Sequence, residues 1–381
     1  MSSVLYILLA FLILSVLIVL HELGHFCMGR WLGFEIEEFA IGMGPVLFRK
    51  KGKRSDFTFR AFLIGGSCRF YGEDDAVSDG KSFNAQPVWK RFLVVVAGPL
   101  MNVLTALVLA FCILLGYGTS TVGSDREHIV ITSIEEGSAA EAAALAEGDV
   151  LLAVNGQAVE NYDAFKSRFD AVRENGVELT VLRGASVTQT QTEQGDRTVQ
   201  KSEPTGGETI TVSVENIRDK RTGNNRLGVG LMLYNDEVLQ RRYNVLTAAA
   251  GAFPYCWNMI VQVYDSLWQL LTGKASIGQL SGVVGTVSIM SETMKEASAV
   301  GVSTVLFVIM ALGALISVNF AVVNLIPFPA LDGGRLVFIV LEMLRGKPID
   351  PEKEGVVHFV GMVLLLLLIV VLMVSDVKKL F

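Results

Sequence analysis

Charged residues and cysteines are both scarce in this sequence. Of its 381 residues, 18% are charged and 51% are hydrophobic, and the mean hydropathy is +0.48. A soluble domain rarely reaches such an average, so the composition indicates membrane-spanning segments. The four cysteines, Cys27, Cys68, Cys112 and Cys256, form no CxxC pair, and none lies between residues 113 and 255. The most polar part of the chain therefore has no disulfide to stabilise it.

The sequence also lacks a basic stripe interleaved with aromatic residues. Its net charge is −6 and its pI is about 5.4, so nothing predicts nucleic-acid binding. The basic residues instead concentrate in two loops between apolar stretches: Arg30, Arg49, Lys50, Lys51, Lys53, Arg54, Arg60, Arg69, Lys81, Lys90 and Arg91, then Arg335, Arg345, Lys347 and Lys353. By the positive-inside rule, both loops are cytoplasmic, and residues 117–303 lie on the extracytoplasmic side of the cell membrane.

Four apolar stretches are long enough to cross ~30 Å of hydrocarbon at ~1.5 Å rise per residue. They predict transmembrane helices within residues 1–33, 92–116, 304–326 and 356–377. The first is not expected to be a cleaved signal peptide, because no basic residue precedes the apolar run and the run ends in HELGHF. The predicted fold class is thus a multi-pass α-helical membrane protein with about four transmembrane helices.

The segments between these helices differ in character. Residues 34–91 begin with alternating, glycine-broken segments, which predict strands with tight turns at the cytoplasmic membrane face and then a loop. Residues 117–240 have the composition of a soluble α+β domain, with a polar insertion at 186–207 that is expected to be disordered. Residues 241–303 predict an amphipathic helix and a connector; the helix lies either at the membrane interface or against the bundle. Residues 327–355 predict a loop and a cytoplasmic segment.

The sequence His21-Glu22-Leu23-Gly24-His25 is an HExxH motif at the end of the first apolar run. The i, i+4 spacing places both imidazoles on one helix face, where both can bind one Zn²⁺, and Glu22 lies beside them as a general base. With four histidines in the chain, a chance HExxH is expected about 0.002 times. Ionisable residues at membrane depth are costly, which favours a metal or a polar cavity over a cluster at the headgroup level.

A hydrolytic zinc site needs a third protein ligand and one open position. Asp332 lies in NLIPFPALDGGR directly after the third span, where Pro327 and Pro329 end the helix and Gly333–Gly334 allow a sharp turn. This predicts a carboxylate presented from an irregular segment at the depth of the histidines. His358, at the start of the fourth span, is the alternative third ligand. His128 falls in the extracytoplasmic segment, on the wrong side.

Three motifs in this order resemble the site-2 proteases, the intramembrane zinc metalloproteases of regulated intramembrane proteolysis. They are HELGH in the first span, GPLMN at Gly98–Asn102 in the second and NLIPFPALDGGR after the third. The segment GSAAEAAALAEGDVLLAVNG resembles the PDZ domain of the bacterial sigma-regulator protease branch. The resemblance covers nearly the whole chain, and it makes residues 117–240 one PDZ-like domain.

The resemblance implies a role for each matching residue. His21, His25 and Asp332 bind zinc, Glu22 is catalytic, and Asn324 contacts the substrate near the scissile bond. The strands within 34–71 form a membrane-associated β-hairpin that takes the substrate as an added strand. The implied substrates are single-span membrane proteins already trimmed on the exterior side, such as anti-sigma factors or signal-peptide remnants.

Two other functions are compatible with parts of the sequence. One is a membrane-anchored quality-control metalloprotease that uses HExxH with a third ligand other than Asp332. The other is a non-catalytic PDZ scaffold or membrane chaperone that keeps zinc for structure. An intact Glu22 argues against the scaffold, because a structural zinc site has no need of a general base.

Overall fold

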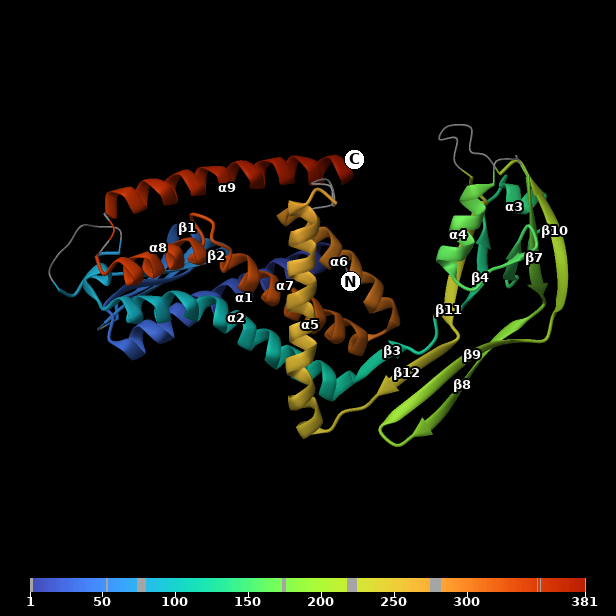
Figure 1. Cartoon of the computed structure of the whole chain (residues 1–381), viewed down its shortest axis with the longest axis horizontal. Coiled ribbons are helices and arrows are strands. Elements are labelled where there is room, and N and C mark those ends of the chain that lie inside the picture. The colour runs from blue at the N-terminus through green and yellow to red at the C-terminus, as the bar shows by residue number, and fades with distance from the viewer. Residues whose placement is uncertain are drawn as a thin grey trace. The chain divides into compact units, whose positions relative to one another are not determined.

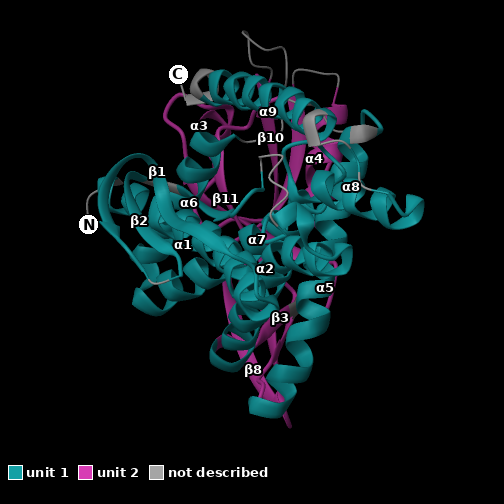
Figure 2. Ribbon diagram, turned by 90° about the vertical axis from the view of Figure 1, so that its left-hand side faces the viewer, with its two compact units in different colours: residues 1–116, 244–381 teal, residues 117–243 magenta. Residues whose placement is uncertain are grey.

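The computed structural model describes residues 3–52, 54–73, 80–172, 176–217, 225–274, 282–347, 349 and 351–380. The chain divides into two compact units, coloured separately in Figure 2. Residues 1–116 and 244–381 form the first, which we call the membrane unit, and residues 117–243 form the second, which we call the sheet unit.

The membrane unit is mainly helical (Figure 1). Its helices are α1 (Ser3–Leu32), α2 (Val88–Tyr117), α5 (Val245–Leu271), α6 (Val283–Val300), α7 (Val302–Asn324), α8 (Asp332–Arg345) and α9 (Pro351–Leu380), with a 3₁₀ turn at Phe83–Ala85. Among the described residues, four helices are long and apolar enough to cross a membrane: Val4–Leu32, Val88–Tyr117, Val302–Asn324 and Lys353–Asp376. The predicted multi-pass class with four spans is confirmed.

Helices α1, α6 and α7 of the membrane unit share one apolar core. Tyr6 and Ala10 of α1 pack with Met290 and Met294 of α6 and with Ile316 of α7, and all five side chains are buried. In a bilayer such contacts stabilise through close packing, because lipid tails are as apolar as the side chains. The core holds α1 in place, and α1 carries the HExxH motif.

The strands predicted within 34–71 are present as β1 (Ile36–Lys50) and β2 (Asp56–Phe70). Each strand bends midway, so that Ile41 has a partner on both sides, Gly66 and Phe59. The two long strands therefore make a small sheet of four short segments. The second half of β2 forms one edge of this sheet.

The sheet unit contains two antiparallel sheets and two short helices, α3 (Ala139–Ala142) and α4 (Tyr162–Ala171). The larger sheet has the order β10-β7-β5-β4-β11, with β6 paired to β5; the smaller has the order β3-β12-β9-β8. The strands are β3 (Thr119–Val122), β4 (Glu127–Ile134), β5 (Val150–Val154), β6 (Gln157–Ala158), β7 (Gly176–Arg183), β8 (Ser186–Gln194), β9 (Arg197–Thr205), β10 (Glu208–Glu215), β11 (Val229–Asn235) and β12 (Glu237–Arg241). The core lies between α4 and the larger sheet, where Phe165 and Phe169 meet Leu179 and Val181.

The expectation that residues 186–207 are disordered is wrong. This segment forms the hairpin β8–β9, and β9 also pairs with β12. Alternating threonines fit an extended strand, and Thr188 and Thr205 share a hydrogen bond of 2.8 Å across the pair. Composition predicted disorder because the hairpin has few large apolar residues, but pairing with β12 supplies the third strand that an isolated hairpin lacks.

The segment 241–303 contains two helices in place of one helix and a connector. Helix α5 begins at a capping box, in which Asn244 and Thr247 bond each other's backbone. Helix α6 follows and joins the apolar core with α1 and α7. The aromatic side chains of Phe253, Trp257 and Trp268 on α5 are more than half exposed, which leaves the interfacial position of α5 a prediction.

Candidate metal centre and active site

Helix α1 runs unbroken through the HExxH motif. His21 and His25 therefore lie one turn apart on the same face. Both residues are buried, and their Nε2 atoms are 3.3 Å apart. The rings meet edge to face, with centroids 4.9 Å apart. The motif thus presents two nitrogen atoms to a single point inside the membrane unit.

Asp332, 307 positions after His25 in the chain, reaches the same point. Its Oδ2 lies 3.0 Å from Nε2 of His21 and 3.5 Å from Nε2 of His25. Burial alone would raise the pKa of the Asp332 carboxyl, but the two imidazoles hold this pKa well below its ordinary value. The carboxylate and the two imidazoles together offer a donor set that can bind a cation.

The turn before Asp332 differs in detail from the prediction. Asp332 is the first residue of α8 and does not lie in an irregular segment. The backbone turns at Ala330, which has a φ of 80°. Gly333 and Gly334 lie inside the helix, where a β-carbon would collide with the carbonyl oxygens of Ile326 and Phe328. These glycines allow the preceding loop to pack directly on the start of α8.

The three residues fit a zinc ion. One atom from each of His21, His25 and Asp332 lies within 4.8 Å of the others, and this donor set leaves the fourth position open, as in hydrolytic zinc enzymes. Tetrahedral bonds of about 2.0–2.1 Å place ligand atoms roughly 3.3 Å apart, which agrees with the 3.0–3.5 Å found here. Oδ2 of Asp332 is also buried, and no described residue donates a hydrogen bond to it.

Helix α2 leaves room for the imidazoles and orients them. A β-carbon at Gly98 would collide with the His25 ring. Nδ1 of His25 lies 2.8 Å from the carbonyl oxygen of Val94. A carbonyl only accepts, so Nδ1 of His25 carries the proton and its Nε2 keeps the lone pair that a metal needs. The GPLMN motif thus serves the metal site directly.

Asn102 is placed to orient the His21 imidazole in the same way. The side-chain amide nitrogen Nδ2 lies 3.0 Å from Nδ1 of His21, Oδ1 has no partner among the described residues, and Asn102 is completely buried. Zinc binding at Nε2 requires a proton on Nδ1, so with zinc bound the amide is expected in the flipped orientation, with Oδ1 facing the ring and accepting the hydrogen bond from Nδ1–H. Ser317 of α7 donates a 2.8 Å hydrogen bond to the backbone carbonyl of Asn102, which ties α7 to this site. The motifs of the sequence do not predict this role for Asn102, although an asparagine within an apolar span is a signal for a polar contact there.

Replacing Asn102 with leucine is expected to weaken zinc binding by roughly 10–100-fold, the usual effect of losing a residue that orients a metal ligand. Replacing it with aspartate keeps an acceptor for the His21 proton and should retain most of the affinity. Competition with a zinc chelator measures both variants. Equal affinity in the leucine variant and the wild type would show that Asn102 does not orient His21.

Glu22 lies in an open cavity shared with the metal ligands. The cavity is lined by Glu22, His25 and Asp332, and by the second half of β2 from Gly66 to Phe70. Gly66 comes close to the glutamate, since a β-carbon there would lie 3.1 Å from Cγ of Glu22. The edge of the sheet therefore runs beside Glu22 along one wall of the cavity.

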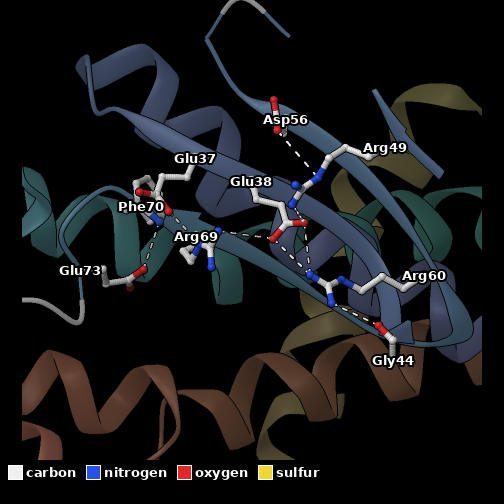
Figure 3. A network of polar contacts seen from close by, with 9 residues as sticks. All are labelled: Glu37, Glu38, Gly44, Arg49, Asp56, Arg60, Arg69, Phe70 and Glu73. Carbon is white, nitrogen blue, oxygen red and sulfur yellow. Dashed lines mark hydrogen bonds and ion pairs between the residues drawn. The ribbon is translucent and has the colours of Figure 1, made fainter. Parts of the chain in front are cut away.

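A buried carboxylate holds the bent sheet together (Figure 3). The side chain of Glu38 is 5% exposed, and Arg60 contacts both of its oxygens at 3.2 Å. Arg49 and Arg69 approach it to 3.4 and 3.8 Å. Burial alone would raise the pKa of Glu38, but the Thr58 hydroxyl and the three arginines outweigh it and lower this pKa. Figure 3 shows that these arginines come from different segments of the hairpin.

The bent sheet should therefore loosen in acid. A lowered pKa means that Glu38 contributes its full stability above the ordinary value of 4.5 and loses it as the pH falls through the lowered pKa. Glu38→Gln should remove this contribution at neutral pH. Solvent weakens ion pairs with partly exposed arginines, so hydrogen exchange in β1 and β2 is expected to accelerate by about tenfold or more. Glu37→Gln is the control, because Glu37 pairs with Arg69 at a more exposed site. Equal exchange in both variants would contradict the prediction.

The other residues considered as metal ligands or substrate contacts lie outside the group formed by His21, His25 and Asp332. His358 of α9 accepts a 3.0 Å hydrogen bond from the Ala330 backbone N–H, so it supports the turn before Asp332 and is not in the group of metal ligands. His128 belongs to the sheet unit and lies 3.4 Å from Asp236. Asn324 ends α7, and it is not among the described residues that line the cavity. Its contact with substrate stays a prediction.

The His-His-Asp group joins two buried histidines of the membrane-spanning helix α1 to Asp332 at the start of α8. With a glutamate beside it, this group defines the class of the protein as a membrane-embedded zinc metalloprotease. Comparison with known proteins supports the same class. The profile of Peptidase family M50 matches residues 9–368. The chain is 30% identical to zinc metalloprotease RasP of Shouchella clausii, over 98% of this chain and 99% of that protein. It is 26% identical to RasP of Geobacillus kaustophilus, over 97% of each. The chain therefore belongs to Peptidase family M50, the site-2 protease family, and its cofactor is zinc.

Proposed function

We propose that this protease cleaves a peptide bond within or near the transmembrane segment of single-span proteins already trimmed on their exterior side. Anti-sigma factors and signal-peptide remnants are the substrate classes, in regulated intramembrane proteolysis. The observation that carries the proposal is the meeting of His21, His25 and Asp332 at the end of an apolar helix, next to a cavity that Glu22 also lines.

His21, His25 and Asp332 would hold the zinc ion. When bound, zinc supplies Lewis acidity, which polarises a peptide carbonyl and makes water more acidic. Glu22 then accepts a proton from the attacking water and returns it to the leaving amine as the C–N bond breaks. Water adds across the peptide bond, giving one carboxyl and one amino terminus. Asn324 is the proposed further contact to the substrate carbonyl.

The edge formed by Gly66–Phe70 would bind the substrate as an added strand. A peptide bond inside a helix is shielded by the helix's own hydrogen bonds, so the substrate must unwind locally before cleavage. In the membrane, freed backbone groups are costly without partners. The outer edge of β2 offers such partners beside Glu22. A substrate bound in an extended conformation along this edge would therefore be unwound for cleavage, and its backbone groups would keep hydrogen-bond partners.

The sheet unit would act as a single PDZ-like domain on the extracytoplasmic side of the cell membrane. The proposed orientation follows from the basic loops, which place the HExxH end of α1 near the cytoplasmic face. Such a domain would exclude bulky ectodomains or bind a newly formed C-terminus. Both actions restrict cleavage to trimmed substrates.

Co-expression with candidate single-span proteins tests the proposal. Each candidate is supplied with its full exterior domain and in a trimmed form, together with the wild type or the Glu22→Gln variant. The proposal expects cleavage of the trimmed form alone, by the wild type alone, at a bond within or near the span. Cleavage in soluble loops would favour a quality-control protease. Equal processing with the Glu22→Gln variant would support a non-catalytic scaffold.

A further inference from the structure

A second pocket of the membrane unit lies where α1 ends and α2 begins. Its lining includes Arg30, Arg54 and Lys81, together with Glu35 and Gln86. None of these residues lines the zinc cavity. Without counting Lys81, Arg30 and Arg54 against the one carboxylate of Glu35 give the described lining a positive charge, and the proposed protease chemistry does not use it.

The pocket lies at the depth of lipid headgroups. Arg30 is in the last turn of α1, about 7.5 Å beyond His25 along the helix. Trp31 at the end of α1 is 77% exposed, and Trp89 at the start of α2 is 52% exposed. Tryptophan is enriched at the boundary between hydrocarbon and water. Two exposed tryptophans at adjoining helix ends therefore mark this boundary beside the pocket.

The two arginines are available to a ligand. Within the described part of the chain, neither Arg30 nor Arg54 has an ion-pair partner. Arg30 lies over the Phe26 ring, 5.8 Å from its centre, which leaves its N–H groups open. Glu35 offsets part of the charge but not all of it. The guanidinium fork matches the oxygens of a phosphate.

We propose that this pocket binds the phosphate of an anionic phospholipid. Basic pockets beside membrane helices recognise such headgroups. Arg30 comes from α1, Arg54 from the β1–β2 connection, and Gln86 from the segment before α2. A phosphate bound here would therefore join the helix that carries HExxH to the hairpin and to α2. The proposal does not depend on the identity of the protease substrate.

The test measures single-lipid binding to the full-length protein in neutral detergent by native mass spectrometry. The probes are phosphatidylglycerol, phosphatidylcholine and inorganic phosphate. The wild type should prefer phosphatidylglycerol, and Arg30→Gln/Arg54→Gln should bind it about 25-fold more weakly, at roughly fivefold per basic residue. Lys50→Gln/Lys51→Gln removes the same amount of charge at the end of β1 and the start of the β1–β2 connection, outside the pocket, and it should change the affinity less than twofold.

Each other result would overturn the proposal. Equal losses in both double variants would show a diffuse charge effect in place of a site. Inorganic phosphate that displaces the lipid at equal concentration would show a free-phosphate site. Unchanged binding in the arginine variant would exclude the pocket. Zinc content serves as the folding control, and the single Arg54→Gln variant replaces the double variant if that protein does not fold.

Discussion

Glu22→Gln is expected to abolish peptide-bond cleavage while zinc stays bound. Glutamine has the same shape but cannot accept a proton at neutral pH, so the general base is lost. Loss of a positioned base lowers the rate by roughly 10²–10⁴-fold, which places cleavage below detection in a cell-based assay. The proposed metal ligands His21, His25 and Asp332 are unchanged in this variant, and one atom from each lies within 4.8 Å of the others.

Two measurements are needed on the same purified variant. Zinc content by elemental analysis should remain at one ion per chain, while cleavage of a trimmed single-span substrate disappears. Cleavage at the wild-type rate would rule out Glu22 as the base. Loss of zinc together with activity would instead assign a structural role to Glu22.

Asp332→Asn is expected to remove the zinc ion. The amide keeps the size of the side chain but lacks the negative charge that faces the two imidazoles at 3.0 and 3.5 Å. The loss should exceed the roughly 10–100-fold expected for a supporting residue such as Asn102. Chelator competition measures the affinity, and cleavage should fall with it.

His358→Gln is the matched comparison for this variant. His358 accepts a hydrogen bond from the Ala330 N–H, and a glutamine oxygen can replace that acceptor. Zinc content should therefore stay at the wild-type level. If zinc is lost from the His358 variant and kept by Asp332→Asn, the third ligand has been assigned to the wrong residue.

Much of the candidate site could be predicted without the structure. The i, i+4 spacing of His21 and His25 follows from helix geometry alone, because local hydrogen bonds fix it. Long apolar runs likewise predict spans, because no other structure satisfies the backbone in lipid except a closed barrel. Asp332 could be proposed as a ligand from its depth. Only the structure places its oxygen against both rings.

Other features depend on contacts between segments far apart in the chain. The role of Asn102 requires knowing that α2 passes beside α1, and the role of His358 requires the packing of α9 on the turn at Ala330. The hairpin at 186–207 forms because β9 pairs with β12, a partner that local composition does not reveal. The sequence predicts that Gly333 and Gly334 form the turn, whereas in the structure their small size allows close packing inside α8.

The sequence by itself determined the membrane spans, the two histidines and the glutamate, because each depends on local chain geometry and on the cost of polar groups in lipid. The tertiary structure decided the third ligand's contacts, the residues that orient the imidazoles and the bent sheet beside Glu22. These depend on which surfaces of distant segments meet, and packing of the whole unit sets that choice.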